Sequence, residues 1–215
     1  PTGSKDPFAQ RRAALGLVDN LITWDLDLDL GPLVEAAADQ LPIEADLTSR
    51  AECLGFIQDR LEHYLRDQAY AYDVVSAVVV EQGRNPAGAA RGAADLTEWI
   101  EREDWEHILD TFARCVRITR GVDLEDQVAP DLLEKKEEQA LYQALEETEA
   151  VDRDPGDVEA FLEVFQPLMP AVEAFFDQVL VMAEDQSVRS NRLALLGRIA
   201  SLSRGAVDLS HLEGF

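Results

Sequence analysis

Positive charge is scarce in this sequence. Its 215 residues include 19 lysines and arginines against 43 aspartates and glutamates, so the formal net charge is −24 at pH 7. Proteins that bind nucleic acid usually carry a basic surface, and a chain with this charge repels a polyanion as a whole. The acidic excess is greatest over residues 125–163, where Lys135, Lys136 and Arg153 are the only basic residues. Any contact with nucleic acid would therefore require a local basic patch elsewhere in the chain.

Cysteines and long apolar runs are also scarce. Cys53 and Cys115 each lie in a separate apolar pattern of helical spacing, which predicts two buried free thiols and argues against a disulfide framework. No apolar run approaches the ~20 residues that a membrane-spanning helix needs, and the N-terminus lacks a signal-peptide pattern. Because the sequence starts at Pro1 rather than Met, we expect it to be a piece of a longer protein.

The residue patterns that carry catalysis or bind metals are missing. His63, His107 and His211 lie far apart, and none is followed by the Asp that an HD-type phosphohydrolase requires. The chain has no paired metal-ligand spacing, no Gly-rich phosphate loop and no Gly-x-Ser-x-Gly element. We therefore predict no catalytic residue, no metal site and no cofactor bound by this chain.

Three alternating aspartates imitate the opening of a calcium loop. Asp25, Asp27 and Asp29 have the right spacing, but such a loop needs Gly at its sixth position and Glu at its twelfth. Leu30 and Ala36 occupy these positions here. Helix capping and turn formation explain the aspartates better, so calcium binding is not predicted.

The sequence predicts an all-α fold, a multi-helix bundle without strands. Apolar residues recur at helical spacing along most of the chain, and Ser49 with Glu52 has the spacing of a capping box. The acidic segment around 134–150 contains Leu141 and Leu145 as an i,i+4 pair, which predicts a helix largely exposed to solvent. Further helices are expected near residues 72–82, 86–101 and 104–119.

A helix pair is expected near the C-terminus, with an acidic break at Glu184–Asp185. Such a pair requires only that each helix cover the apolar stripe of the other. The first stripe consists of Val172, Phe175, Phe176, Val179 and Ala183, and the second of Val188, Leu195, Ile199 and Leu202.

The amino-acid sequence of this helix pair resembles that of a known family. Val181-Met182, Asp185, Arg189 and the run Asn191–Leu196 match the signature of the DALR-type anticodon-binding domain, as found at the C-terminal end of the bacterial-type glycyl-tRNA synthetase β subunit. Two further blocks are similar to the same subunit, in family order: the run from Gly3 to Gly16 and the run from Leu65 to Val78.

This resemblance implies a division of the chain and a function. Residues 1–45 resemble the end of the preceding HD-like region, and residues 46–215 resemble the helical anticodon-binding domain. The whole enzyme would join glycine to tRNA(Gly) with ATP and Mg in the cytoplasm, as a heterotetramer whose α subunit activates glycine. The part represented here would be non-catalytic and would hold the anticodon arm of the tRNA. It would contact neither DNA nor membrane.

Arg114, Arg117 and Arg120 are the first candidates for RNA binding. On a helix they share a face opposite the apolar residues Trp105, Ile108, Phe112 and Cys115. Guanidinium groups suit phosphates and stack on unpaired bases. Ordinary surface charge paired with neighbouring acids is an equally weighted alternative.

The C-terminal motif supplies further candidates. Arg189 should point outward and is the fourth RNA-binding candidate, whereas Asn191 and Arg192 are ambiguous. Arg192 lies beside the apolar stripe, which favours a structural role, paired with Asp185 or Asp177. A different function also stays open: an architectural helical module that braces the α subunit or the rest of the β subunit without touching RNA.

Overall fold

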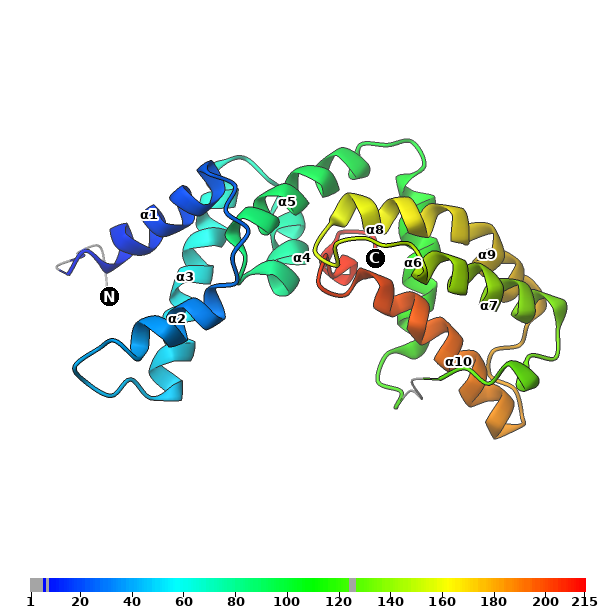
Figure 1. The fold of residues 1–215 in the computed structure, drawn as a ribbon. Coiled ribbons are helices and arrows are strands. Elements are labelled where there is room, and N and C mark those ends of the chain that lie inside the picture. Colours follow the sequence, from blue (N-terminus) through cyan, green and yellow to red (C-terminus); the bar gives the residue numbers. More distant parts are fainter. Residues whose placement is uncertain (1–5, 7, 124–126) are drawn as a thin grey trace. The chain divides into compact units, whose positions relative to one another are not determined.

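The computed structural model describes residue 6, residues 8–123 and residues 127–215 (Figure 1). Over these residues it consists of α-helices and short 3-10 helices, and it contains no strand. The predicted all-α class is therefore confirmed. No described helix is long and apolar enough to cross a membrane.

The chain forms two compact units, Pro1–Glu98 and Trp99–Phe215. This division differs from the boundary expected near residue 45. The physical reason is that the helices on both sides of residue 45 pack against each other, so residues 8–45 and the long helix that follows belong to one body.

The first unit is built around α3 (Leu47–Asp67). The helices α1 (Gln10–Thr23), α2 (Leu30–Ala38) and α4 (Tyr72–Gln82) all pack against it, and α5 (Pro86–Ile100) runs up to the unit boundary (Figure 1). Asp46, and not Ser49, caps α3, because its carboxylate accepts the Ser49 N–H at 2.8 Å. The predicted capping box is therefore wrong by one turn.

The three alternating aspartates form ion pairs, and one of them caps a helix. Asp25 and Asp27 both bind the guanidinium of Arg91 on α5. Asp29 pairs with Arg84 at 3.0 Å and also accepts the N–H of Gly31, which caps α2. They tie the α1–α2 connection to the start of α5, as the capping interpretation requires.

The second unit contains α6 (Trp105–Thr119), α7 (Lys136–Glu149), α8 (Val158–Phe165), α9 (Met169–Gln178) and α10 (Gln186–Ala200). Short 3-10 helices lie at Pro130–Leu132 (η1), Gln166–Leu168 (η2), Ser201–Ser203 (η3) and Leu209–His211 (η4). In this unit α10 packs along α6 and α7 lies against α9 (Figure 1).

The core of the second unit is aromatic at its centre and closed by α10. Phe112 meets Phe161 and Phe165 edge to face, with ring centroids 5.4 and 5.2 Å apart. Buried aromatic pairs of this geometry add about 0.5–1.5 kcal/mol each beyond the area that they bury. In α10, Leu193 and Leu196 are buried as well as Leu195, so this helix is central rather than one-sided.

The helices predicted near 72–82, 86–101, 104–119 and 134–150 are confirmed within one or two residues at each end. The helix expected to run through Val179 and Ala183 is wrong. It ends at Gln178, and Val179 already has extended backbone angles.

The cysteines differ in environment. Cys115 is fully buried, as predicted, and burial raises the pKa of its thiol to about 12. Cys53 is exposed on α3, so the prediction that it is buried is wrong. It continues the stripe of Ile57, Leu61 and Leu65 by one helical turn, but at this end of α3 it lines two open grooves.

We expect this difference to appear in thiol labelling of the native chain. Only the thiolate reacts, and burial keeps Cys115 both protonated and out of reach of a reagent, whereas Cys53 is exposed. A chromogenic disulfide reagent should modify Cys53 within minutes and Cys115 only after a denaturant is added. Rapid labelling of both thiols in the native state would contradict the burial of Cys115.

Candidate nucleic-acid interface

The helix α6 presents an apolar face to the core and a basic edge to solvent. Ile108, Phe112 and Cys115 are buried, Arg114 is half-buried, and Arg117 is exposed. Of the three arginines, Arg117 is therefore exposed on α6 as the sequence predicted, whereas Arg114 is partly covered. Arg120 follows immediately after the last residue of the helix and is exposed.

Arg114 rests on an aromatic ring. Its guanidinium carbon lies 4.3 Å from the centroid of the Phe176 ring, which belongs to α9. A guanidinium held flat on a ring keeps its N–H groups at the edge of the plane, where they can still donate hydrogen bonds. The contact therefore orients Arg114 without neutralising it.

Arg117 and Arg120 are held loosely. Arg117 faces Asp110 at 3.7 Å, and both side chains are about half exposed or more, at 46% and 67%. Exposed pairs of this kind contribute ~0–1 kcal/mol and are screened by salt. Arg120 forms no ion pair with the described residues. Among the described residues, these two side chains are therefore less constrained by ion pairs than the other arginines of the second unit that bind carboxylates.

Most other arginines of the described residues are tied to nearby acids. Arg198, for instance, binds both Glu146 and Glu149, and Arg102 donates two hydrogen bonds to Asp104. The remaining ion pairs hold Arg12, Arg50, Arg66, Arg84 and Arg91. Among the described residues, the basic edge of α6 forms one long ion pair, between Arg117 and Asp110, while Arg114 and Arg117 also rest on the rings of Phe176 and Phe215.

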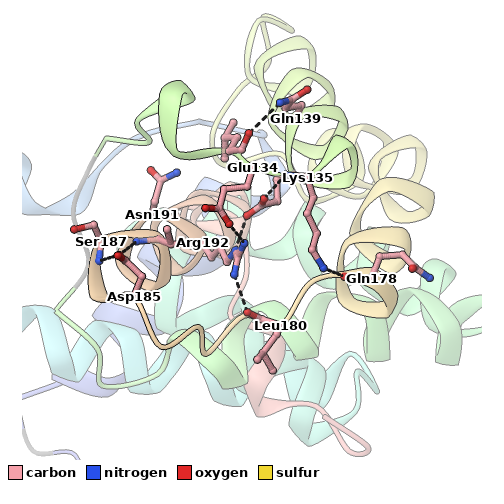
Figure 2. Close-up of polar contacts among 12 residues, drawn as sticks. Glu134, Lys135, Gln139, Gln178, Leu180, Asp185, Ser187, Asn191 and Arg192 are labelled. Carbon is pink, nitrogen blue, oxygen red and sulfur yellow. Dashed lines mark hydrogen bonds and ion pairs between the residues drawn. The ribbon is translucent and has the colours of Figure 1, made fainter.

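Arg192 has a structural position. It is 4% exposed, and its Nε binds the carboxylate of Glu138, which is completely buried (Figure 2). Its other nitrogens donate to Glu134 at 3.4 Å and to the Leu180 carbonyl at 3.0 Å. The predicted partners Asp185 and Asp177 are wrong.

Asp185 instead caps α10. Its carboxylate accepts the N–H groups of Ser187 and Val188 at 2.8 and 3.0 Å (Figure 2). A carboxylate that satisfies two free donors at a helix N-terminus is not available to pair with Arg192.

Asn191 also has a structural role. Its side-chain amide accepts the Ala129 N–H at 2.7 Å and donates to the Ala129 carbonyl at 3.1 Å. Arg189 is half-buried and donates to the Ala183 carbonyl at 3.4 Å. Of the four RNA-binding candidates, Arg189 is therefore the one whose guanidinium donates a hydrogen bond to the backbone of the same unit.

Sequence reasoning missed Glu138. It lies in the acidic stretch that was interpreted as a solvent-exposed face, yet it is buried together with Leu141 and Leu145. Its position gave a signal, because residues 138, 141 and 145 share one side of a helix. Burial of the carboxylate raises its pKa, but hydrogen bonds from Arg192 and from the Lys135 N–H outweigh this effect and leave the pKa lowered.

The first unit contains two apolar grooves but, among its described residues, no constellation of catalytic groups. The grooves lie on either side of α3 and share Ser49 and Cys53. Ile43 and Leu47 are large apolar residues that are 72% and 81% exposed at this end of α3. The described residues of the whole chain hold no cluster of three or more His, Cys, Asp or Glu side chains suited to a metal ion.

Comparisons with known proteins agree with this arrangement of the chain. The family model of the glycyl-tRNA synthetase β subunit matches residues 1–80, and the DALR anticodon-binding domain matches residues 108–209. The second match coincides with most of the second structural unit.

Curated relatives match almost the whole chain. The glycine–tRNA ligase β subunits of Moorella thermoacetica and Ralstonia nicotianae are both 36% identical over 99% of this chain, covering 32% and 31% of their own lengths. The chloroplastic/mitochondrial glycine–tRNA ligase 2 of Arabidopsis thaliana is 34% identical over 100% of this chain and 20% of its own length. The chain thus spans about a third or less of these relatives.

The buried ion pair generates a stability prediction. Removing one partner leaves the other charge buried and unpaired, which typically costs about 3–5 kcal/mol. We expect Arg192→Leu and Glu138→Leu each to lower the free energy of unfolding by this amount in urea titrations. The double variant should recover most of that stability. A double variant as unstable as the two single changes combined would contradict a coupled pair.

The same pair predicts a dependence on pH. Because the pKa of Glu138 is lowered in the folded state, its contribution is complete above its ordinary value of 4.5 and disappears as the pH falls through the lower folded value. The difference in unfolding free energy between the wild type and Glu138→Gln should therefore be largest near neutral pH. It should shrink on acidification below about pH 4.5, and a difference that grows there would contradict this sign.

Proposed function

This chain belongs to the family of the glycyl-tRNA synthetase β subunit, and we propose that its second unit binds the anticodon arm of tRNA(Gly). The observation that carries the proposal is the basic edge of α6. The edge consists of Arg114, Arg117 and Arg120. All three lie within residues 108–209, which match an anticodon-binding domain. Arg117 and Arg120 are exposed and Arg114 is half-buried, in a chain that is otherwise strongly acidic.

The proposed contact combines two kinds of interaction. Phosphates of the stem would bind the guanidinium groups, and this sequence-independent term fixes the position of the RNA. Unpaired anticodon bases would then be recognised by stacking and by hydrogen bonds to their edges. The acidic remainder of the surface disfavours binding in other orientations, because like charges repel.

We infer the reaction of the whole enzyme from the family to which the chain belongs. It would be the ATP- and Mg-dependent joining of glycine to tRNA in the cytoplasm, with glycine activated on the α subunit of a heterotetramer. In this scheme the present chain contributes no reacting group. It positions the tRNA so that the distant acceptor end reaches the active site.

The exposed apolar surface of the first unit supports a second function, that of an architectural brace. Ile43 and Leu47 are mostly exposed, although each is large and apolar, and they adjoin a groove lined by Leu41 and Val34. Because relatives are about three times as long as this chain, we propose that this surface packs against the remainder of the β subunit. Bracing and RNA binding are compatible, since they use different units.

The RNA contact can be tested by neutralising the arginines. In the whole enzyme, Arg114→Gln, Arg117→Gln and Arg120→Gln together should weaken tRNA binding and lower the salt slope of log K by about 0.7–0.9 for each phosphate that the protein no longer neutralises. Affinity would be measured at several salt concentrations with unmodified tRNA(Gly). Lys136→Gln, an exposed cation on α7, serves as the matched control and should leave the slope unchanged. An unchanged slope in the triple variant would overturn the proposal.

The brace predicts an assembly defect. In the complete β subunit, Ile43→Glu with Leu47→Glu should weaken the association of the first unit with its neighbour by tenfold or more, because burying each apolar side chain contributes about 1.5–3 kcal/mol. Protease resistance of the first unit would report this association. Val80→Glu, at a residue of α4 that is 51% exposed, is the control. Equal resistance of the double variant and the wild type would contradict the brace.

A further inference from the structure

The segment between α9 and α10 alternates between inward and outward side chains. Val179 and Val181 are buried, at 5% and 6% exposure, whereas Leu180 and Met182 are 70% and 56% exposed. The segment is not helical: Val179 has extended backbone angles, residues 181 and 182 form a bend, and the Ala183 N–H bonds to the Val181 carbonyl at 2.9 Å. The segment therefore presents two neighbouring apolar side chains to solvent.

Three cationic side chains hold the backbone of this segment in place. Lys135 donates to the Gln178 carbonyl and Arg192 to the Leu180 carbonyl (Figure 2). Arg189 donates to the Ala183 carbonyl at 3.4 Å. Arg192 is in turn fixed by the buried carboxylate of Glu138. An exposed connection is thus as firmly oriented as a core element, although its outward side chains contribute little to the core.

The segment adjoins the proposed RNA-binding edge. Phe176, whose ring carries the guanidinium of Arg114, precedes Leu180 by four residues along the chain. The basic edge of α6 and the outward side chains of Leu180 and Met182 are therefore connected through α9.

The charges and hydrogen-bond donors around the segment favour contact with a base of an RNA over contact with its phosphates. Asp177 and Glu184 flank the segment, and their charges disfavour phosphate. The N–H groups of Leu180 and Met182 form no hydrogen bond with the described residues, so they are free donors beside two apolar surfaces. Free donors next to apolar side chains suit the edge and the face of an unpaired base.

We propose that residues 179–183 form a pre-ordered platform for an unpaired base of the bound RNA. Leu180 and Met182 contact the face of the base, and the backbone donors contact its edge. Arg192 is a positioning residue, because it fixes the Leu180 carbonyl and touches no ligand. The proposal rests on the RNA-binding function of the second unit.

Photo-crosslinking tests the placement. A benzophenone amino acid would replace Met182 in the whole enzyme, with the same group at Val151, which is 49% exposed, as the control. With tRNA(Gly) bound, the group at position 182 should crosslink to a nucleotide of the anticodon loop and the group at position 151 should not. Crosslinks from position 182 to protein alone would overturn the proposal in favour of a protein interface.

Affinity measurements separate this platform from the arginine contact. Leu180→Ser with Met182→Ser should weaken tRNA(Gly) binding roughly tenfold to a hundredfold, the range for deleting a side chain that stacks on a base, and leave the salt slope unchanged. Replacing the crosslinked nucleotide with an abasic one should remove the difference between the variant and the wild type. Both residues are exposed, so the thermal midpoint should not move.

Each failure is distinguishable. If the serine variant binds tRNA as tightly as the wild type, the platform is wrong, whatever the arginine variants do. If the arginine variants keep the wild-type slope while the serine variant binds more weakly, the α6 contact is wrong and the base contact stands.

Discussion

The buried pair of Arg192 and Glu138 is the interaction on which the second unit depends. Moving two charges out of water is costly, and the cost is offset only if both groups find enough partners. Arg192 meets this condition by binding two carboxylates and a backbone carbonyl, and Glu138 also accepts the Lys135 N–H. The pair therefore links the start of α7 to the middle of α10 and to the segment just before α10, although Glu138 and Arg192 are 54 positions apart in sequence.

This linkage shows one way in which a strongly acidic chain uses its few cations. Many of its cations are used internally, either on carboxylates or on backbone carbonyls, and they order the fold instead of contacting ligands. The arginines of α6 differ because the aromatic ring of Phe176 and a weakly paired Asp110 orient them without full neutralisation. A small basic edge within a repulsive surface favours a single docking orientation, which the proposed positioning of a tRNA would require.

The sequence predicted the helices well because their signals are local. Apolar spacing placed α4 to α7 within one or two residues. It failed where a local pattern was ambiguous: Val179 and Ala183 continue a helical spacing, yet the alternation of Val179, Leu180, Val181 and Met182 fits an extended chain as well. The sequence-based prediction also failed at the start of α3, where Asp46 and Ser49 are both suitable N-cap residues and Asp46 is the one that caps the helix.

The sequence by itself determined the all-α class, the family and the exposed position of Arg117 on α6, since each depends on residue types and their spacing. Only the tertiary structure decided the partners of Arg192, the burial of Glu138 and the double hydrogen bond of Asn191 to Ala129. These contacts join residues more than fifty positions apart, and a charge has no preferred partner along the chain. The choice among many available carboxylates is made by which helix faces pack together.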